Sequence, residues 1–289
     1  MFIGIRGNIN KETIGSSIAL IVSELDKKNI SFALDSELKR VLPKSYSPTL
    51  FMPFSKILKL SDIIISIGGD GTFLNTARLV GKSGVPILGI NTGNLGFLAD
   101  ITLNEFKRFL GTILNNKFRK VERELVEAMT PDGKILTGLN DIVIDKFDSI
   151  RMIEIELIYN EEKVYTCVAD GIIVSTPTGS TGYSLSTGGP IVIPRSRVFV
   201  ISPICPHTLN IRPIVIPDDG KIEIRINTFC KIRITADGQE AIKIDSPASI
   251  ILKKADHSIT LIRRPNVTYF NTLKTKLFWG EDKRKNNNK

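Results

Sequence analysis

The chain has 289 residues, of which 42% are hydrophobic and 24% are charged, a balance typical of globular proteins and not of disordered chains. At roughly 100–200 residues per domain, this length predicts about two domains. The formal net charge of +9 suits a partner that carries negative charge, such as a nucleotide or a nucleic acid, but it also suits lysines scattered over a solvated surface, since dense basic clusters are few.

Cysteine and histidine are too sparse for several classes of site. The three cysteines, Cys167, Cys205 and Cys230, form no C-x-x-C pair, which argues against a disulfide framework, a zinc ribbon and a redox motif. The longest apolar runs, such as Ile63–Ile67, have the length of a strand and not of a membrane-spanning helix. The N-terminus lacks the pattern of a signal peptide, so we expect a cytoplasmic protein.

The first 115 or so residues alternate between strand and helix patterns. Short apolar runs predict buried strands, and apolar residues at helical spacing predict the helices between them. The expected strands are 2–5, 30–34, 62–67 and 85–90, and the expected helices are 11–28, 73–80 and 103–114. This alternation predicts an α/β domain with a parallel sheet.

The pattern changes in the second half of the chain, where polar and apolar residues alternate strictly. Such alternation is typical of half-exposed antiparallel strands, so we expect a mostly antiparallel, β-sandwich-like domain. The clearest stretches are 153–157, 221–226, 231–234 and 241–244. We expect an α/β domain over 1–118, a β-rich domain over 119–265, and an extension over 266–289 that packs back on the first domain and ends in a frayed tail.

A glycine-rich loop, Gly68-Gly69-Asp70-Gly71-Thr72, joins a predicted buried strand to a predicted helix. Glycines let the backbone approach a ligand, and the free N–H groups of a helix N-terminus bind phosphate. A carboxylate repels phosphate, so Asp70 needs another purpose. It could accept a proton from an attacking hydroxyl, or it could simply cap the helix.

A second loop, Asn91-x-Gly93-x-x-Gly96, also follows a predicted strand. It is similar to the dinucleotide-binding fingerprint, with Asn91 in place of the first glycine, and it also suits a plain strand-to-helix turn. Because parallel strands end at one edge of their sheet, we expect this loop to lie beside the first one.

The third segment, Thr176–Pro190, is rich in hydroxyl side chains and glycines and follows the apolar run Gly171–Val174. Many hydrogen-bonding groups with little bulk suit a polyphosphate and a ribose, although a long surface turn would have a similar composition. Other motifs fail: Gly81-Lys82-Ser83 lacks the first Walker glycine, Ser180 lacks the first glycine of G-x-S-x-G, and His207 has no pattern around it that indicates catalysis.

Taken together, these segments resemble the NAD kinase family. The similarity includes Asn140-Asp141, Asp170-Gly171, Pro206-His207-Thr208-Leu209, Arg212-Pro213 and Asp237-Gly238-Gln239, and covers about residues 62–240. Lipid kinases and phosphofructokinases have loops similar to Gly68–Thr72, so the segment from Thr178 to Pro190 makes the resemblance specific.

The resemblance implies an enzyme that transfers phosphate from ATP, with Mg²⁺ or another divalent cation, to the adenosine 2′-hydroxyl of NAD. It places the active site in a crevice between the two domains, with Asp70 as the general base. The NAD-binding residues that it implies are Asp70, Gly71, Phe97, Asn140, Asp141, Arg151, Asp170, Thr178, Thr181, Gly182, Tyr183, Ser184, Ser186 and Gln239. The phosphate-binding residues that it implies are Gly68, Gly69, Gly71, Thr72, Gly179 and Ser180, and no metal ligand is assigned.

Two positions depart from the family pattern. Asp141 stands where glutamate is usual, and Asn75 stands where a basic residue is often found. The resemblance also implies a homodimer or homotetramer, with no membrane and no nucleic acid as partner. The competing hypotheses are a lipid kinase, which the polar Thr178–Ser186 stretch disfavours, and a dinucleotide-sensing or nucleic-acid-binding protein, which the net charge of +9 suggests.

Overall fold

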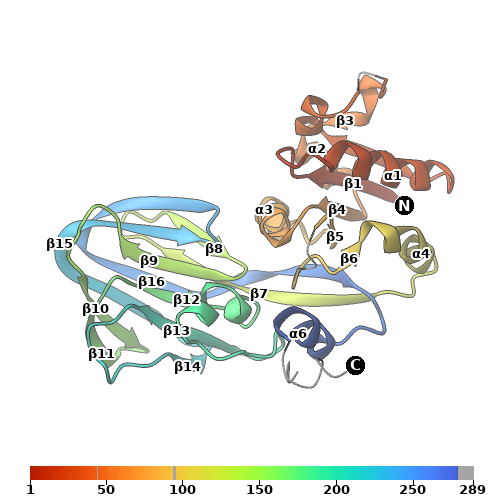
Figure 1. The fold of residues 1–289 in the computed structure, drawn as a ribbon. Helices are drawn as coiled ribbons and strands as arrows, with labels where there is room; N and C mark the ends of the chain where they lie inside the picture. The colour runs from red at the N-terminus through yellow and green to blue at the C-terminus, as the bar shows by residue number, and fades with distance from the viewer. Residues whose placement is uncertain (44, 94–95, 279–289) are drawn as a thin grey trace, which may run out of the picture. The chain divides into compact units, whose positions relative to one another are not determined.

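The computed structural model describes residues 1–43, 45–93 and 96–278 (Figure 1). Internal contacts divide the chain into two units. Unit 1 comprises Met1–Glu122 together with Thr260–Lys289, and unit 2 comprises Arg123–Ile259. These units divide at residues 122/123 and 259/260, where the sequence expectation has 118/119 and 265/266. The tail that we expected to be frayed lies outside the described residues.

Unit 1 is built on a parallel sheet with the strand order β5-β4-β1-β2-β3. Short β6 pairs with β5, and Leu261, near the end of β16, pairs in parallel with Ile87 of β5. The strands are β1 (Phe2–Gly7), β2 (Ser31–Asp35), β3 (Phe51–Met52), β4 (Ile63–Ile67), β5 (Ile87–Asn91) and β6 (Ile101–Thr102). The predicted parallel α/β arrangement is therefore confirmed.

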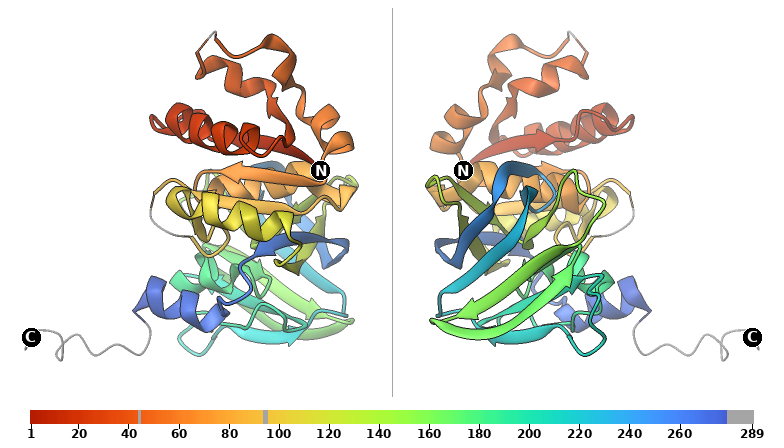
Figure 2. Two further views of the ribbon diagram at one scale, coloured as in Figure 1. Left: turned by 90° about the vertical axis from the view of Figure 1, so that its right-hand side faces the viewer. Right: turned by 90° about the vertical axis from the view of Figure 1, so that its left-hand side faces the viewer.

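Helices cover both faces of this sheet. Alternate strand residues such as Ile3, Ile65 and Ile90 share one core cluster with α1 and α4, which lie on the same side of the strands in Figure 2. The opposite face meets α2 and α3: a Cβ at Gly89 would lie 2.9 Å from Phe73, and the hydroxyls of Ser66 and Thr76 are 2.9 Å apart. The helices are α1 (Ile14–Asp26), α2 (Phe54–Leu60), α3 (Asp70–Val80), α4 (Leu103–Leu114) and α6 (Tyr269–Leu277).

Unit 2 consists mainly of antiparallel strands, as the alternating pattern predicts. Its strands follow the order β14-β13-β12-β9-β15-β16, while β10 pairs with β11 and β15, and β7 pairs with β8 and β16. The strands are β7 (Arg119–Met129), β8 (Ile135–Gly138), β9 (Asp141–Lys146), β10 (Ile153–Tyr159), β11 (Glu162–Ala169), β12 (Gly171–Ser175), β13 (Val198–Ile204), β14 (Ile214–Pro217), β15 (Ile222–Ala236) and β16 (Glu240–Arg263). The short helix α5 (Tyr183–Ser186) lies in the hydroxyl-rich segment.

A single long strand, β15, contains two stretches that the sequence presents as separate strands, 221–226 and 231–234. Its pairing with β16 shifts register between Ile226 and Cys230, which is typical of a β-bulge that bends the strand. The first half of β15 pairs with β10 and the second half with β9. The bend thus carries one strand past two different neighbours.

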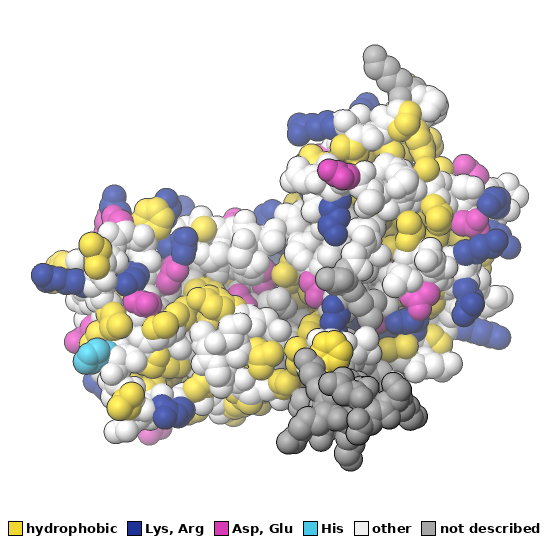
Figure 3. All heavy atoms as spheres, viewed as in Figure 1, with side chains coloured by type: hydrophobic (Ala, Val, Ile, Leu, Met, Phe, Trp, Pro, Cys, Tyr) yellow, Lys and Arg dark blue, Asp and Glu magenta, His cyan; other side chains and the backbone are white. Residues whose placement is uncertain are grey.

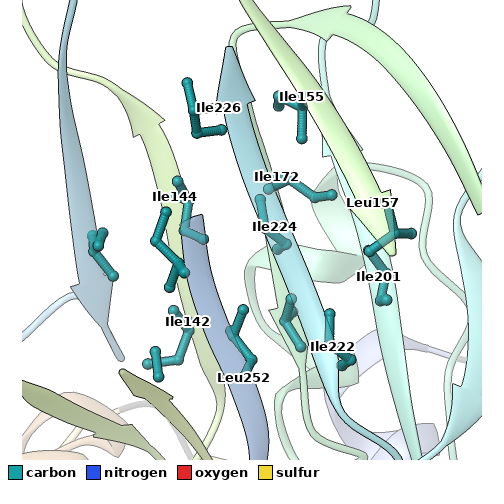
Figure 4. Close-up of a cluster of buried hydrophobic side chains, with 14 of the residues drawn as sticks. Ile142, Ile144, Ile155, Leu157, Ile172, Ile201, Ile222, Ile224, Ile226 and Leu252 are labelled. Carbon is teal, nitrogen blue, oxygen red and sulfur yellow. The ribbon is translucent and has the colours of Figure 1, made fainter. Parts of the chain in front are cut away.

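The core of unit 2 lies inside this bent sheet. Figure 4 shows isoleucines of β9, β12, β13 and β15 pointing into one cluster, in which Ile144, Ile224 and Leu252 are fully buried. Each contributes about 1.5–3 kcal/mol by leaving water. The polar residues between them on β9 and β15 therefore face away from the core, where they are available for a site.

Within the described residues, no helix is both long enough and apolar enough to cross a membrane. On the face drawn in Figure 3, lysine and arginine side chains are interspersed with acidic and neutral ones. This face therefore lacks the continuous basic stripe that nucleic-acid binding would favour.

Candidate functional site

A pocket of about 540 Å³ opens on the polar side of unit 2. Its walls come from the β8–β9 connection, the strands β9 and β15, the β15–β16 turn, the start of β16 and α5. The lining residues are Asn140, Asp141, Val143, Asp145, Tyr183, Arg233, Thr235, Asp237, Gly238, Gln239, Glu240 and Ala241. Four of the NAD-binding residues that the family resemblance implies are among them: Asn140, Asp141, Tyr183 and Gln239.

Sheet register explains why residues so distant in the sequence share this pocket. Arg233 pairs with Asp145 across β15 and β9, and Thr235 pairs with Val143. Because alternate residues of a strand point to the same face, both pairs lie on the side opposite the core. Arg233 donates from Nε and Nη2 to the two carboxylate oxygens of Asp145 at 3.0 and 2.5 Å, so the two charges offset each other.

The backbone bend at residues 139–141 is held by the carboxylate of Asp237. Its Oδ2 accepts from Leu139 N at 2.8 Å, and its Oδ1 accepts from Asn140 N and Asp141 N at 2.6 and 3.1 Å. Asp237 lies in a tight turn closed by Gln239 N donating to Ala236 O at 2.8 Å. Asp237 and Gly238 have φ of 52° and 65°, the left-handed conformation that an Asp-Gly hairpin turn favours.

The carbonyl groups of the same bend are held from the other side. Thr176 N donates to Asn140 O at 2.8 Å, and Thr176 Oγ1 donates to Leu139 O at 2.6 Å. Gly179 packs directly on this backbone, since a Cβ there would lie 2.0 Å from Asn140 O. The bend is therefore fixed by hydrogen bonds on both its N–H and its C=O groups.

Two carboxyl groups make this region electrostatically unusual. Asp141 is 5% exposed, and burial together with the nearby charge of Asp237 raises its pKa to about 7. Asp237 as a residue is partly exposed, but its carboxyl group lies deep enough for burial to raise its pKa, which its three backbone N–H donors oppose. The three N–H donors favour the charged form of Asp237, whereas burial and that charge favour the protonated form of Asp141.

The hydroxyl-rich segment has both internal and outward-facing groups. Ser180 Oγ donates to Pro177 O at 2.8 Å and accepts from Val192 N at 3.0 Å, while Ser184 Oγ lies 3.1 Å from Ser202 Oγ. These two fully buried serines thus hold the segment itself. Tyr183 is 47% exposed and lines the pocket.

The glycine-rich loop of unit 1 leads into α3, whose first residue is Asp70. The carboxylate of Asp70 accepts three hydrogen bonds from the following loop: Oδ2 accepts from Phe97 N at 2.7 Å, and Oδ1 accepts from Leu98 N and Ala99 N at 3.0 and 3.1 Å. A Cβ on Gly96 would lie only 1.8 Å from Asp70 Oδ1, so this contact requires glycine. The expected adjacency of the two loops is therefore found, although Asn94 and Leu95 lie outside the described residues.

Two arginines from the second segment of unit 1 complete this loop. Arg263 donates to Phe97 O at 2.6 Å and pairs with Asp100 at 2.8 Å. Arg264 donates to Asp100 O at 2.7 Å and pairs with Glu105 at 2.8 Å. Phe97, expected to contact the adenine, is thus fixed by its backbone on both sides.

Two basic residues near this edge carry no signal in the sequence motifs. Arg6, at the end of β1, donates to Asn75 Oδ1 at 3.1 Å and pairs with Asp35 and Glu37. A Cβ on Gly93 would lie 3.2 Å from Lys11 Nζ. Because β4 lies between β1 and β5, Lys11 reaches from the loop after β1 across the end of β4, where the glycine-rich loop begins.

Some expected site residues are not brought to the pocket. Arg151 is exposed, and Asp170 pairs with Lys146 at 2.7 Å. Conversely, the sequence motifs did not single out Asp145, Arg233 and Glu240. For Asp145 and Arg233 the only signal is the alternation along β9 and β15, which becomes informative once the two strands are known to pair. Glu240 is the first residue of β16, directly after the turn.

Comparisons with known proteins agree with this description. Residues 11–118 match the family model of the ATP-NAD kinase N-terminal domain, and residues 139–264 match that of the ATP-NAD kinase C-terminal domain. An NAD kinase of Bacteroides fragilis is 43% identical over 78% of each chain. An NAD kinase of Flavobacterium psychrophilum is 36% identical over 98% of this chain and 100% of its own length.

Solved structures share the fold. Yeast NADH kinase complexed with NADH aligns with a TM-score of 0.88 at 22% identity, over 98% of this chain and 89% of the other. An NAD kinase from Archaeoglobus fulgidus in complex with ATP aligns with a TM-score of 0.73 at 26% identity, over 94% and 97%. Fold and relatives together define an enzyme of the phosphate-transferring class. The chain belongs to the ATP-NAD kinase family.

Proposed function

We propose that this protein transfers the terminal phosphate of ATP to the 2′-hydroxyl of the adenosine ribose in NAD and so produces NADP. The observation that carries the proposal is the pocket of unit 2, whose walls include Asn140, Asp141, Tyr183 and Gln239. These are residues that the family resemblance assigns to NAD. Membership of the ATP-NAD kinase family supports both substrates.

In this proposal, NAD lies against the 139–141 bend. The Asn140 amide offers both a donor and an acceptor, and a protonated Asp141 offers both as well, which suits the paired hydroxyls of a ribose. Tyr183 provides a partly exposed aromatic ring against which a base can pack. The remaining NAD contacts, at Gly71, Phe97, Arg151, Asp170, Thr178, Thr181, Gly182, Ser184 and Ser186, stay predictions.

Phosphate binding is assigned to the glycine-rich loop. Asp70, Gly71 and Thr72 form the first turn of α3 directly after Gly68 and Gly69, and the N-terminus of a helix attracts phosphate. The Lys11 ammonium reaches the same edge and adds positive charge for a polyphosphate. Gly179 stays a predicted phosphate contact from unit 2, and so does Ser180, whose hydroxyl in this structure is hydrogen-bonded to Pro177 O and Val192 N.

Asp70 is proposed as the general base that accepts the proton of the 2′-hydroxyl. Its two oxygens have about four lone-pair positions, and three are occupied by backbone N–H donors. One position therefore remains for a substrate hydroxyl, and the other three hold the carboxylate in one orientation. The proposal requires this group and the unit 2 pocket to serve a single reaction.

Within residues 1–43, 45–93 and 96–278, no group of three or more His, Cys, Asp or Glu side chains is arranged to hold a metal ion. Mg²⁺ usually keeps several waters and binds substrate phosphates with few protein ligands. The described residues therefore fit a cation that arrives bound to the phosphates of ATP, where it would neutralise phosphate charge. We assign it no protein ligand.

The test is to incubate the purified protein with ATP and Mg²⁺ and either NAD or NADH, and to measure NADP or NADPH with a dehydrogenase specific for the phosphorylated forms. We expect product that depends on ATP. Absence of product, with binding of RNA or DNA that weakens steeply with salt, would instead favour the nucleic-acid-binding hypothesis. Light scattering of the same sample measures whether it is the homodimer or homotetramer that we propose.

A further inference from the structure

We propose that Asp237 is a positioning residue of the nucleotide site. Its carboxylate fixes the 139–141 bend and so aims Asn140 and Asp141 into the pocket. This inference rests on the proposed function, because it assigns a purpose to a residue next to the proposed NAD-binding pair.

The first support is geometric. One carboxylate accepts three consecutive backbone N–H groups, from Leu139, Asn140 and Asp141, at 2.6 to 3.1 Å. Residues with fixed φ and ψ also have fixed Cα–Cβ directions, so this contact sets where both side chains point. Without it, three N–H groups at a largely buried position would lose their acceptor, which is costly.

The second support is how closely the bend is surrounded. A Cβ on Gly138 would lie 2.4 Å from Asp141 O, and a Cβ on Gly179 would lie 2.0 Å from Asn140 O. Thr176 holds the carbonyl groups of the bend. The bend therefore has little freedom to recover its position by another route once Asp237 is changed.

The third support is electrostatic. The negative charge of Asp237 helps to raise the pKa of Asp141, after burial, which is the larger cause. The other ionisable groups that line the pocket are Asp145, Arg233, Glu240 and Tyr183. Asp145 and Arg233 are paired with each other, so Asp237 is the carboxylate that acts most directly on Asp141.

Asp237→Asn is the sharpest test, because asparagine also tolerates the left-handed conformation that the turn requires. The asparagine oxygen can still accept from the N–H groups of Asn140 and Asp141. Its NH₂ group would face the N–H of Leu139, and two donors form no hydrogen bond with each other. We expect the KM for NAD to rise about tenfold, the equivalent of one unsatisfied buried group, with the KM for ATP unchanged. The pH profile of KM for NAD should also shift to lower pH, because the negative charge beside Asp141 is gone.

Asn160→Ala is the matched control. Asn160 also occupies a left-handed position in a hairpin turn, and its side chain accepts from Lys221 N at 2.9 Å, but it does not line the pocket. We expect it to lower Tm without changing the KM for NAD or the pH profile. If Asp237→Asn behaves in the same way, the positioning role is wrong.

Asp237→Glu keeps the negative charge beside Asp141 but moves the carboxylate, so it tests the geometry of the contact apart from its charge. It also serves as a second variant if Asp237→Asn does not fold. It should raise the KM for NAD while keeping the pH profile of the unchanged protein. An unaltered KM in this variant would contradict the proposal. If the unchanged protein makes no NADP at all, the proposed function fails, and this outcome is distinct from failure of the positioning role.

Discussion

The glycine-rich loop of unit 1 and the 139–141 bend of unit 2 use the same device in different surroundings. In each, one aspartate accepts three consecutive backbone N–H groups: Asp70 from residues 97–99, and Asp237 from residues 139–141. Asp70 begins a helix and is half-buried, whereas Asp237 lies in a hairpin turn next to the buried carboxyl group of Asp141.

Because their surroundings differ, the carboxylates of Asp70 and Asp237 can play different roles. Asp70 retains a lone pair and belongs to the loop proposed to bind phosphate, so it is suited both to hold the 97–99 backbone and to accept a proton. Asp237 acts on a neighbouring carboxyl group, so its charge also influences which form of Asp141 meets the ligand. The same hydrogen-bonding pattern is therefore compatible with a catalytic residue in one unit and a positioning residue in the other.

The largest expected effect tests the catalytic half of this comparison. Asp70→Asn should lower kcat at least roughly 100-fold, the usual worth of a general base, while NAD still binds. Stopped assays with NAD and ATP measure kcat, and equilibrium titration measures NAD binding. If turnover stays near normal, Asp70 is not the general base and only holds the backbone of residues 97–99, as Asp237 holds that of residues 139–141.

Gly96→Ala tests whether the position of the Asp70 carboxylate matters for catalysis, whereas Asp70→Asn tests whether the carboxylate itself is needed. The added Cβ would overlap Asp70 Oδ1, so the carboxylate must move. We expect kcat to fall about tenfold or more, since proton transfer requires hydrogen-bond geometry. Gly81→Ala, where a Cβ would meet no atom within 4 Å, is a control for loss of stability alone, because φ there is 48°. Full activity in Gly96→Ala would show that the position of the carboxylate does not matter.

Gly179→Ala tests the bend of unit 2 from its carbonyl side. The new Cβ would meet the backbone of Asn140, which cannot rotate away. We expect about 2 kcal/mol of destabilisation, typical of overpacking, with a higher KM for NAD. Thermal unfolding and steady-state kinetics measure the two effects, and an unchanged KM would contradict the role of the bend in binding.

The pH dependence of stability tests the charge of Asp141. Its pKa is 3.8 in the reference state and about 7 in the folded protein, so between these values the unfolded chain releases a proton that the native protein keeps. The contribution of protonated Asp141 to the free energy of unfolding is therefore fully present below about pH 4, and it is lost as the pH rises toward 7. Asp141→Asn cannot ionise, so its Tm relative to the unchanged protein should increase over this range. A constant difference would mean that Asp141 ionises normally.

The smallest expected effect comes from Asp141→Glu, which restores the residue usual in the family. One added methylene moves the carboxyl group further into a pocket of about 540 Å³ that has room for it. We expect the KM for NAD to change by only a few-fold, because a methylene is worth about 1 kcal/mol. A change of 100-fold would show that the length of this side chain is decisive for NAD binding.

Local patterns in the sequence predicted much of the fold. Helix α4 spans Leu103–Leu114, the range that its apolar spacing predicts, because a capping box formed by Thr102 and Glu105 defines its start. Helix α2 was missed because seven residues give too little periodicity. The single strand β15 appeared as two stretches because residues 227–230, at its bulge, interrupt the alternation.

The candidate site was only partly predictable for a related reason. Asn140, Asp141 and Gln239 belong to short motifs, so the family resemblance indicates them. Arg233 and Asp145 are 88 residues apart and meet only through the pairing of β15 with β9, which no local pattern specifies. The anchoring contacts of Asp70 and Asp237 were missed in the same way, since their donors lie 27 to 29 and 96 to 98 residues away.

The two separate segments of unit 1 have a consequence for how the protein is made. Arg263 and Arg264 fix the loop from Phe97 to Asp100, whose backbone in turn holds Asp70. During synthesis on the ribosome, these arginines emerge only after all of unit 2. The residue proposed as the base therefore cannot acquire its final surroundings until translation has nearly finished, and a nascent chain halted before Thr260 would remain inactive.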